Sequence, residues 1–253
     1  MRKLDRSVAI RPANWVTIAH GAVPDHALFV LRATAFEALP FSDPVRRAGF
    51  AAYAPDALPL SNGKPGFKAV WGRHKKPIAG ISDWQCAYCE CSMNSPRVGQ
   101  VEHFKPKSRF PLAAYDWDNY LLACGGCNGP KGDNWPDVGQ YVRPDDSSYD
   151  PTLHFRFKAD GDVDSLSLDA DRTILDFELK RELLIRDRKM AIDKLQWQIG
   201  IVAEIYSLNA SMGKRRARQI LESTRDPKKT PYSTALTQFV SGALRAAIPG
   251  FSI

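Results

Sequence analysis

The sequence has no long apolar run. Among its 253 residues no segment approaches the roughly 18 uninterrupted apolar residues that indicate a membrane-spanning helix. The first residues, MRKLDRSVAIRP, carry charges but no apolar stretch follows them, which argues against a secretory signal. Internal repeats and low-complexity segments are also missing. These absences argue against a membrane partner, and we expect a soluble protein of the cytoplasm.

Cysteine is scarce as well. The chain has five cysteines, an odd number, and four of them stand in metal-ligand spacing, which fits a reducing compartment better than a disulfide framework. The formal net charge of +7 and the pI of about 9.2 favour a polyanionic partner, DNA or RNA. With 44% hydrophobic residues the chain can bury a sizeable core.

Two cysteine pairs dominate the middle of the chain. They are Cys86-x-x-Cys89 and Cys124-x-x-Cys127. Each spacing lets a tight turn aim two thiolates at one point, and two such turns close a tetrahedral zinc site. Because all four ligands are thiolates, this zinc is structural. Cys91 is expected to be a free thiol beside the site, with an exchange for Cys89 as the alternative.

The insert between the two pairs combines strand and loop signals with polar residues. Residues 98–103 (VGQVEH) read as a strand, 115–120 as a polar aromatic loop, and 121–123 as a second strand. Asn128-Gly129-Pro130 resembles a helix start, with asparagine as the cap. The sequence therefore predicts a small ββα element pinned by zinc.

The polar residues of this region suit the hydrolysis of a phosphodiester. His103 is the predicted general base, because an imidazole titrates near neutral pH. Glu102 and the carbonyl oxygen of Asn128 are predicted to hold a catalytic Mg²⁺ or Mn²⁺. Asn119 can bridge backbone groups of the loop and so hold His103 in position. Alone, His103 would be interpreted as a structural histidine; its setting favours catalysis.

Four cations surround these residues. We expect them to contact phosphates of a nucleic acid: Lys105, Lys107, Arg109 and Lys131.

These motifs carry a resemblance to a known family. CAYCE, VEHFKPKS, YDWDNYLLAC and CNGPKGDN, within residues 84–135, resemble the HNH endonucleases with a zinc-pinned ββα-metal site. They are most similar to the PtuB-like HNH proteins of the Septu and certain retron anti-phage systems. The resemblance implies His103 as general base, Glu102 as metal ligand and Asn119 as the central asparagine. Asn128 stands in place of the family's last histidine. An ABC-type ATPase of the PtuA kind is the implied partner.

The flanking segments read as mainly helical, so we expect an α+β fold in which the HNH module lies within a single domain, 1–253. An N-terminal arm and helical part cover 1–83, with a helix at 25–39, and a mainly helical part covers 136–253. Its longest pattern, 171–207, repeats apolar residues at helical spacing and is interpreted as core-facing, with partner binding as the alternative. The repeating residues are Leu175, Leu179, Leu183, Met190 and Trp197, joined by Ile199, Val202, Ile205 and Tyr206.

Two other functions compete with this interpretation. A zinc-ribbon-like nucleic-acid-binding module would keep the cysteines and basic residues but would not need Glu102, His103 or Asn119. A stand-alone restriction or homing HNH enzyme would need an element that reads base sequence, and the chain has no helix-turn-helix or zinc-finger array.

Overall fold

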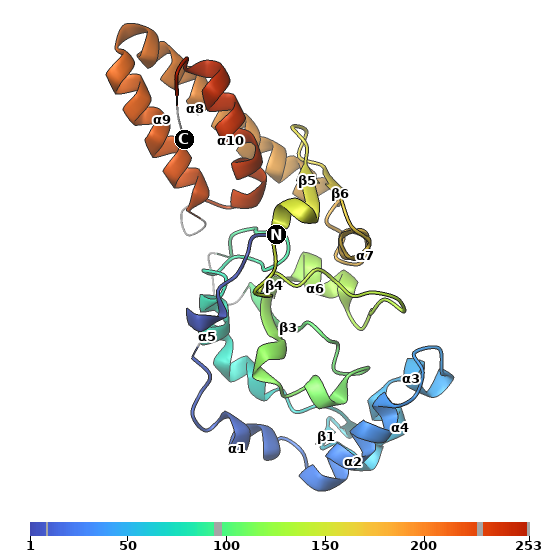
Figure 1. Ribbon diagram of the computed structural model, residues 1–253. Coiled ribbons are helices and arrows are strands. Elements are labelled where there is room, and N and C mark those ends of the chain that lie inside the picture. Colours follow the sequence, from blue (N-terminus) through green and yellow to red (C-terminus); the bar gives the residue numbers. More distant parts are fainter. Residues whose placement is uncertain (9, 94–97, 227–229, 252–253) are drawn as a thin grey trace.

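The computed structural model describes residues 1–8, 10–93, 98–226 and 230–251. It is a mixed structure of helices and small two-stranded antiparallel sheets (Figure 1). The strand pairs within the described residues are β1 with β2, β3 with β4, and β5 with β6. Figure 1 shows β3, β4 and α6 in the middle of the molecule, between the N-terminal helices and the C-terminal ones.

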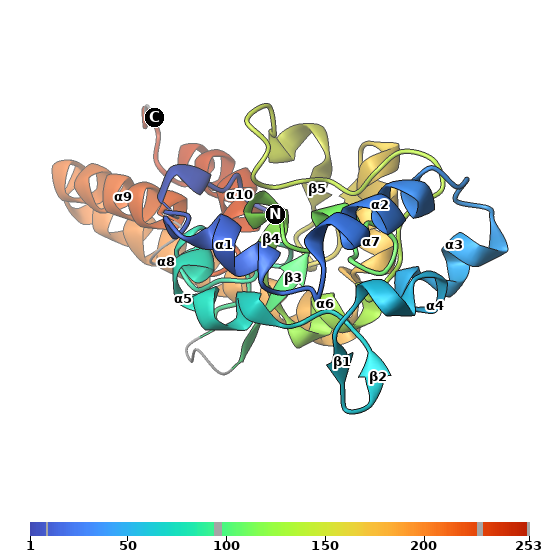
Figure 2. The same cartoon turned by 90° about the horizontal axis from the view of Figure 1, so that it is seen from below.

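The N-terminal part wraps one side of that middle region. Its elements are η1 (Arg6–Val8), α1 (Trp15–His20), α2 (His26–Glu37), α3 (Pro44–Ala48), α4 (Phe50–Tyr53), η2 (Pro55–Ala57), β1 (Leu60–Ser61), β2 (Lys64–Pro65), η3 (Val70–His74) and α5 (Lys75–Gly80). The predicted helix at 25–39 is confirmed as α2, and the Asp25 side chain caps it by accepting from the amide of Leu28. Figure 2 shows the β1–β2 hairpin projecting from the body.

The middle region contains strand, loop, strand and helix in the predicted order. β3 (Gly99–His103) pairs antiparallel with β4 (Tyr120–Cys124), and His103 lies opposite Tyr120. Between them lie η4 (Pro111–Ala113) and η5 (Trp117–Asn119). The predicted helix start at Asn128 is wrong: α6 (Gly125–Lys131) begins directly after β4, with Cys124 at its N-cap. Asn128 and Pro130 therefore lie inside the helix.

The C-terminal part is mainly helical, as predicted. It contains η6 (Pro151–Leu153), a hairpin of β5 (Phe155–Phe157) and β6 (Val163–Ser165), then α7 (Leu168–Asp176), α8 (Glu182–Leu208), α9 (Ala210–Arg225) and α10 (Ser233–Ala247). The single long helix predicted over 171–207 is wrong, because the chain breaks between α7 and α8. Glu178 adopts a left-handed conformation there, with φ of 48°.

The interpretation of the apolar repeat in 171–207 as core-facing is confirmed for Leu179, Ile199 and Val202 but wrong for four other members, which are exposed: Leu175, Leu183, Met190 and Trp197. Leu183, Met190 and Trp197 are 56%, 63% and 67% exposed. α8 buries Leu184, Ile192 and Leu195 together with Ile199 and Val202. Residues seven apart share one helix face, so the exposed three form a stripe along α8.

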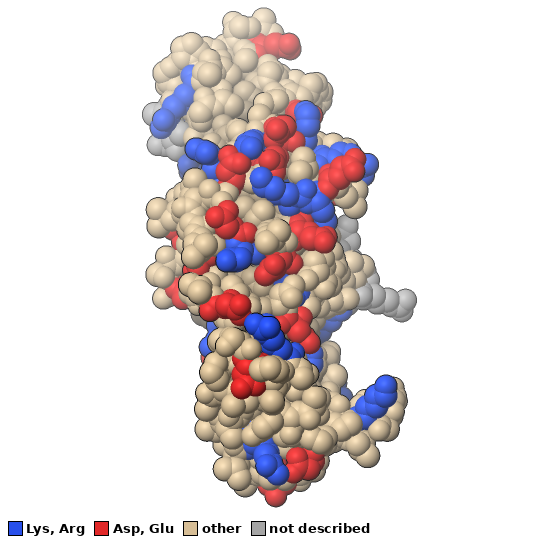
Figure 3. All heavy atoms as spheres, turned by 90° about the vertical axis from the view of Figure 1, so that its right-hand side faces the viewer, with Lys and Arg blue, Asp and Glu red and all other residues tan. Residues whose placement is uncertain are grey.

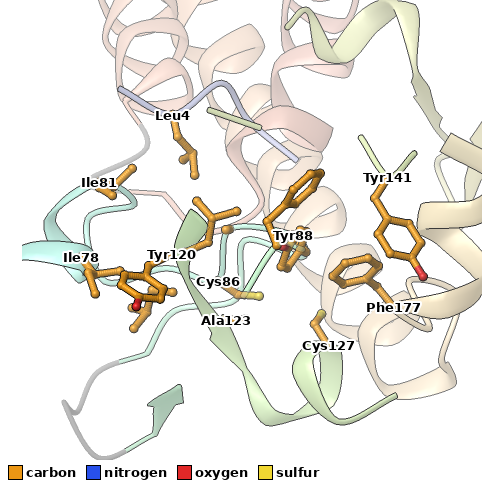
Figure 4. Close-up of a cluster of buried hydrophobic side chains, with 14 of the residues drawn as sticks. Leu4, Ile78, Ile81, Cys86, Tyr88, Tyr120, Ala123, Cys127, Tyr141 and Phe177 are labelled. Carbon is orange, nitrogen blue, oxygen red and sulfur yellow. The ribbon is translucent and has the colours of Figure 1, made fainter. Parts of the chain in front are cut away.

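Two separate hydrophobic clusters stabilise the described structure. The larger surrounds β3, β4 and the cysteines and extends to Tyr141 and Phe177 (Figure 4). The smaller lies inside the bundle of α8, α9 and α10, the C-terminal bundle. Burial in the second cluster is internal to those three helices, so the C-terminal bundle has a core of its own.

The surface in Figure 3 mixes charges of both signs. Lys and Arg side chains there are interspersed with Asp and Glu, so this face is not a continuous basic surface. Among the described residues, no helix combines the length and the apolar character that a membrane span requires.

Candidate functional site

The four predicted zinc ligands converge. The sulfur atoms of Cys86, Cys89, Cys124 and Cys127 all lie within 4.8 Å of one another, and all four residues are buried. The sulfurs of Cys89 and Cys124 are 3.7 Å apart, close to the edge of about 3.8 Å that a tetrahedron with Zn–S bonds of about 2.3 Å has. Cys86 and Cys127 point toward each other in Figure 4. The geometry and the thiol chemistry fit a structural zinc ion.

The backbone shapes the first cysteine turn around this point. The amide of Cys86 donates to the carbonyl of Cys91 over 3.0 Å, and Glu90 takes a left-handed conformation with φ of 62°. The amide of Ala87 donates to the carbonyl of Leu122 over 2.9 Å, which ties the turn to β4. Cys91 is not one of the four converging cysteines, but its thiol contacts those of Cys124, Cys86 and Cys89, and these contacts raise the pKa of Cys91.

Arg181 contacts the sulfur cluster from outside the motif. Its guanidinium nitrogens lie 3.6 Å from the sulfurs of Cys127 and Cys89 and 3.9 Å from that of Cys124. Burial would lower the pKa of Arg181, but the charges of Cys127 and Cys89 outweigh burial and raise it. The guanidinium therefore remains charged beside the thiolates.

Glu102 is engaged in a buried ion pair. Its Oε1 lies 2.5 Å from Nζ of Lys131, and its Oε2 accepts from the hydroxyl of Tyr88 over 2.7 Å. Lys131 also donates to the backbone carbonyl of His103 over 2.7 Å. Lys131 was predicted to contact a phosphate, but its side chain is only 1% exposed and faces Glu102. The N-cap of α6 is Cys124, four residues before the predicted cap, Asn128.

The two predicted ligands of a catalytic cation do not form a cation site in this arrangement. Both oxygens of Glu102 are used by Tyr88 and Lys131, and the ammonium stands where a divalent ion would have to bind. The side-chain amide of Asn128 donates to Oε1 of Gln100 over 2.6 Å. These residues therefore do not fit a bound Mg²⁺ or Mn²⁺ as they stand.

His103 lies on the opposite face of β3 from Glu102, as the two-residue period of a strand requires. Its Nε2 is 3.0 Å from the carbonyl oxygen of Ala114. The ring packs edge-on against Trp71 and Tyr120, with centroids 4.5 Å and 5.1 Å away. Burial, then the charge of Lys107, lowers the pKa of His103 to about 3. The imidazole is therefore neutral near pH 7.

The neutral ring has one tautomer that satisfies this contact. A carbonyl only accepts, so Nε2 of His103 carries the proton and donates to Ala114. Nδ1 is then a lone-pair acceptor. Within the described part of the chain, no protein atom is hydrogen-bonded to Nδ1.

Asn119 connects two stretches of the loop that follows β3. Its Oδ1 accepts from the amide of Lys105 over 2.8 Å, and its Nδ2 donates to the carbonyls of Lys105 and Ala113 over 3.0 Å and 2.9 Å. Ala113 precedes Ala114, whose carbonyl holds His103 and also accepts from the Tyr120 hydroxyl. Asn119 thus fixes the backbone that orients the imidazole.

The three remaining predicted cations lie along the same loop. Lys105 is exposed, and Nζ of Lys107 lies 5.7 Å from the ring centroid of Trp71, the neighbour of His103. Arg109 lines a polar cleft of about 590 Å³ together with Arg47 and Arg172. Guanidinium groups from three distant segments thus meet in one cleft, which Asp133 and Asp137 also line.

Comparison with known proteins gives one partial similarity. A curated protein described as "Septu protein PtuB", from Bacillus thuringiensis, is 38% identical over 76 residues. Over this stretch the chain is similar to a Septu protein. The matched part is 29% of this chain and 28% of that protein, so the chain matches less than a third of the relative's length. No family model matches the chain. No solved structure matches it either.

Sequence reasoning missed three residues of this region: Tyr88, Trp71 and Arg181. Tyr88 lies between the first two cysteines, and its position in the motif gave no sign of a bond to Glu102. Trp71 and Arg181 are 32 and 54 residues in sequence from the site residues that they contact, His103 and Cys127. No local pattern links such distant positions.

Proposed function

We propose that the chain is an HNH-type nuclease that hydrolyses phosphodiester bonds of nucleic acid in a Septu-like anti-phage defence system. The observation that carries the proposal is the geometry of His103, a neutral imidazole fixed at Nε2 and with Nδ1 available. The partial similarity to the Septu protein PtuB supports the defence role.

In the proposed mechanism, Nδ1 of His103 accepts a proton from a water molecule, and the resulting hydroxide attacks the phosphorus atom. The bond from phosphorus to the leaving sugar oxygen breaks, and that oxygen takes a proton from solvent water. The carbonyl of Ala114, already bonded to Nε2, stabilises the imidazolium that forms. Lys107 lies on the same side, over Trp71, and can neutralise charge that develops on the phosphate. Asn119 acts indirectly, by holding the loop backbone.

A requirement for Mg²⁺ or Mn²⁺ belongs to this proposal as an expectation from the motif. In the structure described here such an ion would first have to displace Lys131 from Glu102. No step of the mechanism above is therefore assigned to it. Titration of the reaction with each ion and with EDTA tests the requirement directly.

We propose further that the nuclease acts with an ABC-type ATPase of the PtuA kind. The partial similarity to a Septu protein supports this partnership. The exposed stripe of Leu183, Met190 and Trp197 offers apolar surface for a protein partner.

The experiment compares wild type with His103→Ala on plasmid DNA, single-stranded DNA and tRNA. His154→Ala is the matched control, because His154 bonds to Ser167 away from the loop. We expect cleavage by wild type and His154→Ala, and none by His103→Ala at unchanged zinc content and circular dichroism. If pure His103→Ala protein cleaves as fast as wild type, His103 is not the general base.

A zinc-dependent binding module without catalysis is the competing function, and the burial of His103 favours it: the residue is only 7% exposed. If wild type binds nucleic acid but does not cleave it, even with the ATPase partner added, this alternative holds. Cleavage that appears only in the complex supports the nuclease and makes the isolated chain latent.

A further inference from the structure

Arg181 is placed to act on the zinc centre although it belongs to another part of the fold. It is the residue immediately before α8, and the amides of Leu184 and Ile185 donate to its carbonyl over 3.0 Å and 3.1 Å. Its backbone thus begins the first helix of the C-terminal bundle, while its guanidinium contacts three of the four sulfurs. Arg181 thus connects the C-terminal bundle to the cysteine cluster.

The positive charge of Arg181 stabilises the negatively charged zinc centre. Four thiolates around Zn²⁺ leave a net charge of −2, and the region is buried. A guanidinium that donates to the sulfurs offsets one of these charges and makes the thiolates harder to protonate, which stabilises the bound metal. Loss of zinc would in turn remove the organised charge that holds Arg181 on this side, leaving its bond to the carbonyl of Glu178 over 3.1 Å.

α6 leaves space for the guanidinium at a single glycine. A Cβ atom on Gly126 would lie 3.2 Å from Nε of Arg181 and 3.3 Å from its Cζ. Gly129, in the same helix, has nothing within 4 Å of such an atom. Glycine inside a helix costs about 1 kcal/mol relative to alanine, and at Gly126 the close approach of Arg181 explains its presence.

A second contact ties the same cysteine turn to the C-terminal bundle. Glu90 lies between Cys89 and Cys91, and its Oε2 accepts from the amide of Thr234 over 3.0 Å and from the hydroxyl of Ser233 over 3.2 Å. These residues begin α10. The other carboxylate oxygen of Glu90, Oε1, lies 3.0 Å from the amino group of Met1. The starts of α8 and α10 are thus both held at the first cysteine turn.

We propose that Arg181 is a positioning residue of the zinc centre, and that zinc retention and attachment of the C-terminal bundle depend on each other through it. Such a coupling is reciprocal: whatever weakens the attachment must also weaken the binding of zinc, by the same factor. The bundle has its own core, so it can stay folded when its attachment is lost. The inference does not depend on the proposed nuclease activity.

The experiment uses the full chain with zinc bound and compares Gly126→Ala with Gly129→Ala. Both changes add the same methyl group to α6, but only the first crowds the guanidinium, which must then shift by a few tenths of an ångström. Arg181→Gln removes the charge, Arg181→Lys keeps it, and Arg186→Gln alters an exposed arginine of α8. Zinc loss is followed with a chromophoric chelator, and hydrogen exchange is measured over 182–188, 195–202 and 233–237.

We expect Gly126→Ala and Arg181→Gln to release zinc about 10-fold to 100-fold faster than Gly129→Ala and Arg186→Gln, with partial rescue in Arg181→Lys. Removing zinc from wild type should speed exchange at the starts of α8 and α10 and leave 195–202 protected. Equal zinc release by all variants overturns the role of Arg181. Faster release with unchanged exchange at 182–188 overturns the coupling. If Arg181→Gln does not fold, the two glycine variants decide alone.

Discussion

Lys131 and Glu102 form an ion pair, 2.5 Å between Nζ and Oε1, with side chains that are 1% and 0% exposed. Removing one partner of such a pair leaves a buried charge uncompensated. We therefore expect Lys131→Met to lower the free energy of unfolding by about 3–5 kcal/mol, measured by urea denaturation.

The control for that prediction is the double variant Lys131→Met/Glu102→Gln, which removes both charges. It should recover much of the lost stability, because a neutral amide can still accept from Tyr88. Lys105→Met, on an exposed lysine, should change stability by less than about 0.5 kcal/mol. A Lys131→Met variant as stable as wild type would contradict the ion pair.

Asn119→Asp keeps the shape of the side chain but removes the amide that donates to Lys105 and Ala113. Two carbonyls then face a carboxylate, and we expect a loss of about 2 kcal/mol or more in unfolding free energy. If the proposed function holds, kcat should fall more than KM rises, since His103 loses its fixed orientation. Unchanged stability and kcat would show that Asn119 does not organise the loop.

The depressed pKa of His103 predicts a dependence of stability on pH. The folded state holds this imidazole neutral down to about pH 3, whereas the unfolded chain takes up a proton near pH 6.5. Between these values the unfolded state binds more protons, so stability falls as pH drops below about 6.5. Relative to His103→Gln, wild type should lose up to about 1.4 kcal/mol per pH unit.

That comparison is made between about pH 6.5 and pH 5.5, with zinc content checked at each point, because acid also protonates the cysteine ligands. Parallel stability curves for wild type and His103→Gln would show that His103 titrates normally. The same low pKa predicts that nuclease activity, if present, has no acid limb near pH 6.5 from this residue.

Cys124→Ser should lose stoichiometric zinc and unfold in part, since binding of a structural zinc is coupled to folding. Cys91→Ser is the matched control and should keep both zinc and stability, because its sulfur is outside the converging set. Metal analysis and thermal denaturation test both variants. Zinc loss in Cys91→Ser would show that the ligand set includes Cys91.

Trp197→Gln should change the free energy of unfolding by less than about 0.5 kcal/mol, because the tryptophan is 67% exposed. Leu195→Ala, two residues away and 3% exposed, should cost about 2–5 kcal/mol through the cavity it leaves. Urea denaturation compares the two. Equal losses of unfolding free energy in the two variants would mean that the stripe of Leu183, Met190 and Trp197 is buried.

The parts of the fold that the sequence predicts well are those with short-range signals. The cysteine spacing identifies the four sulfurs that converge, and α2 appears where its periodicity places it. The pattern around Asn128 failed because proline and asparagine are common at helix starts, whereas the short link from β4 to α6 was set by Cys124.

The long-range contacts were beyond a sequence reading. α8 carries two apolar sets at helical spacing, and periodicity alone cannot say which of them, Leu195 with Ile199 or Met190 with Trp197, faces the core. Arg181, Trp71 and the Tyr88–Glu102 bond depend on how distant segments fold together. Burial of His103 likewise comes from Trp71, a residue of the N-terminal part.

The link from Glu90 to the start of α10 has a consequence for how the protein is made. A ribosome completes Glu90 more than 140 residues before Ser233 and Thr234 emerge. The four sulfurs of the metal centre can come together only after Cys127 has been synthesised. The contacts with Arg181 and with α10 form later still. During translation, the first cysteine turn can therefore make all of its contacts only after the last helix, α10, has been synthesised.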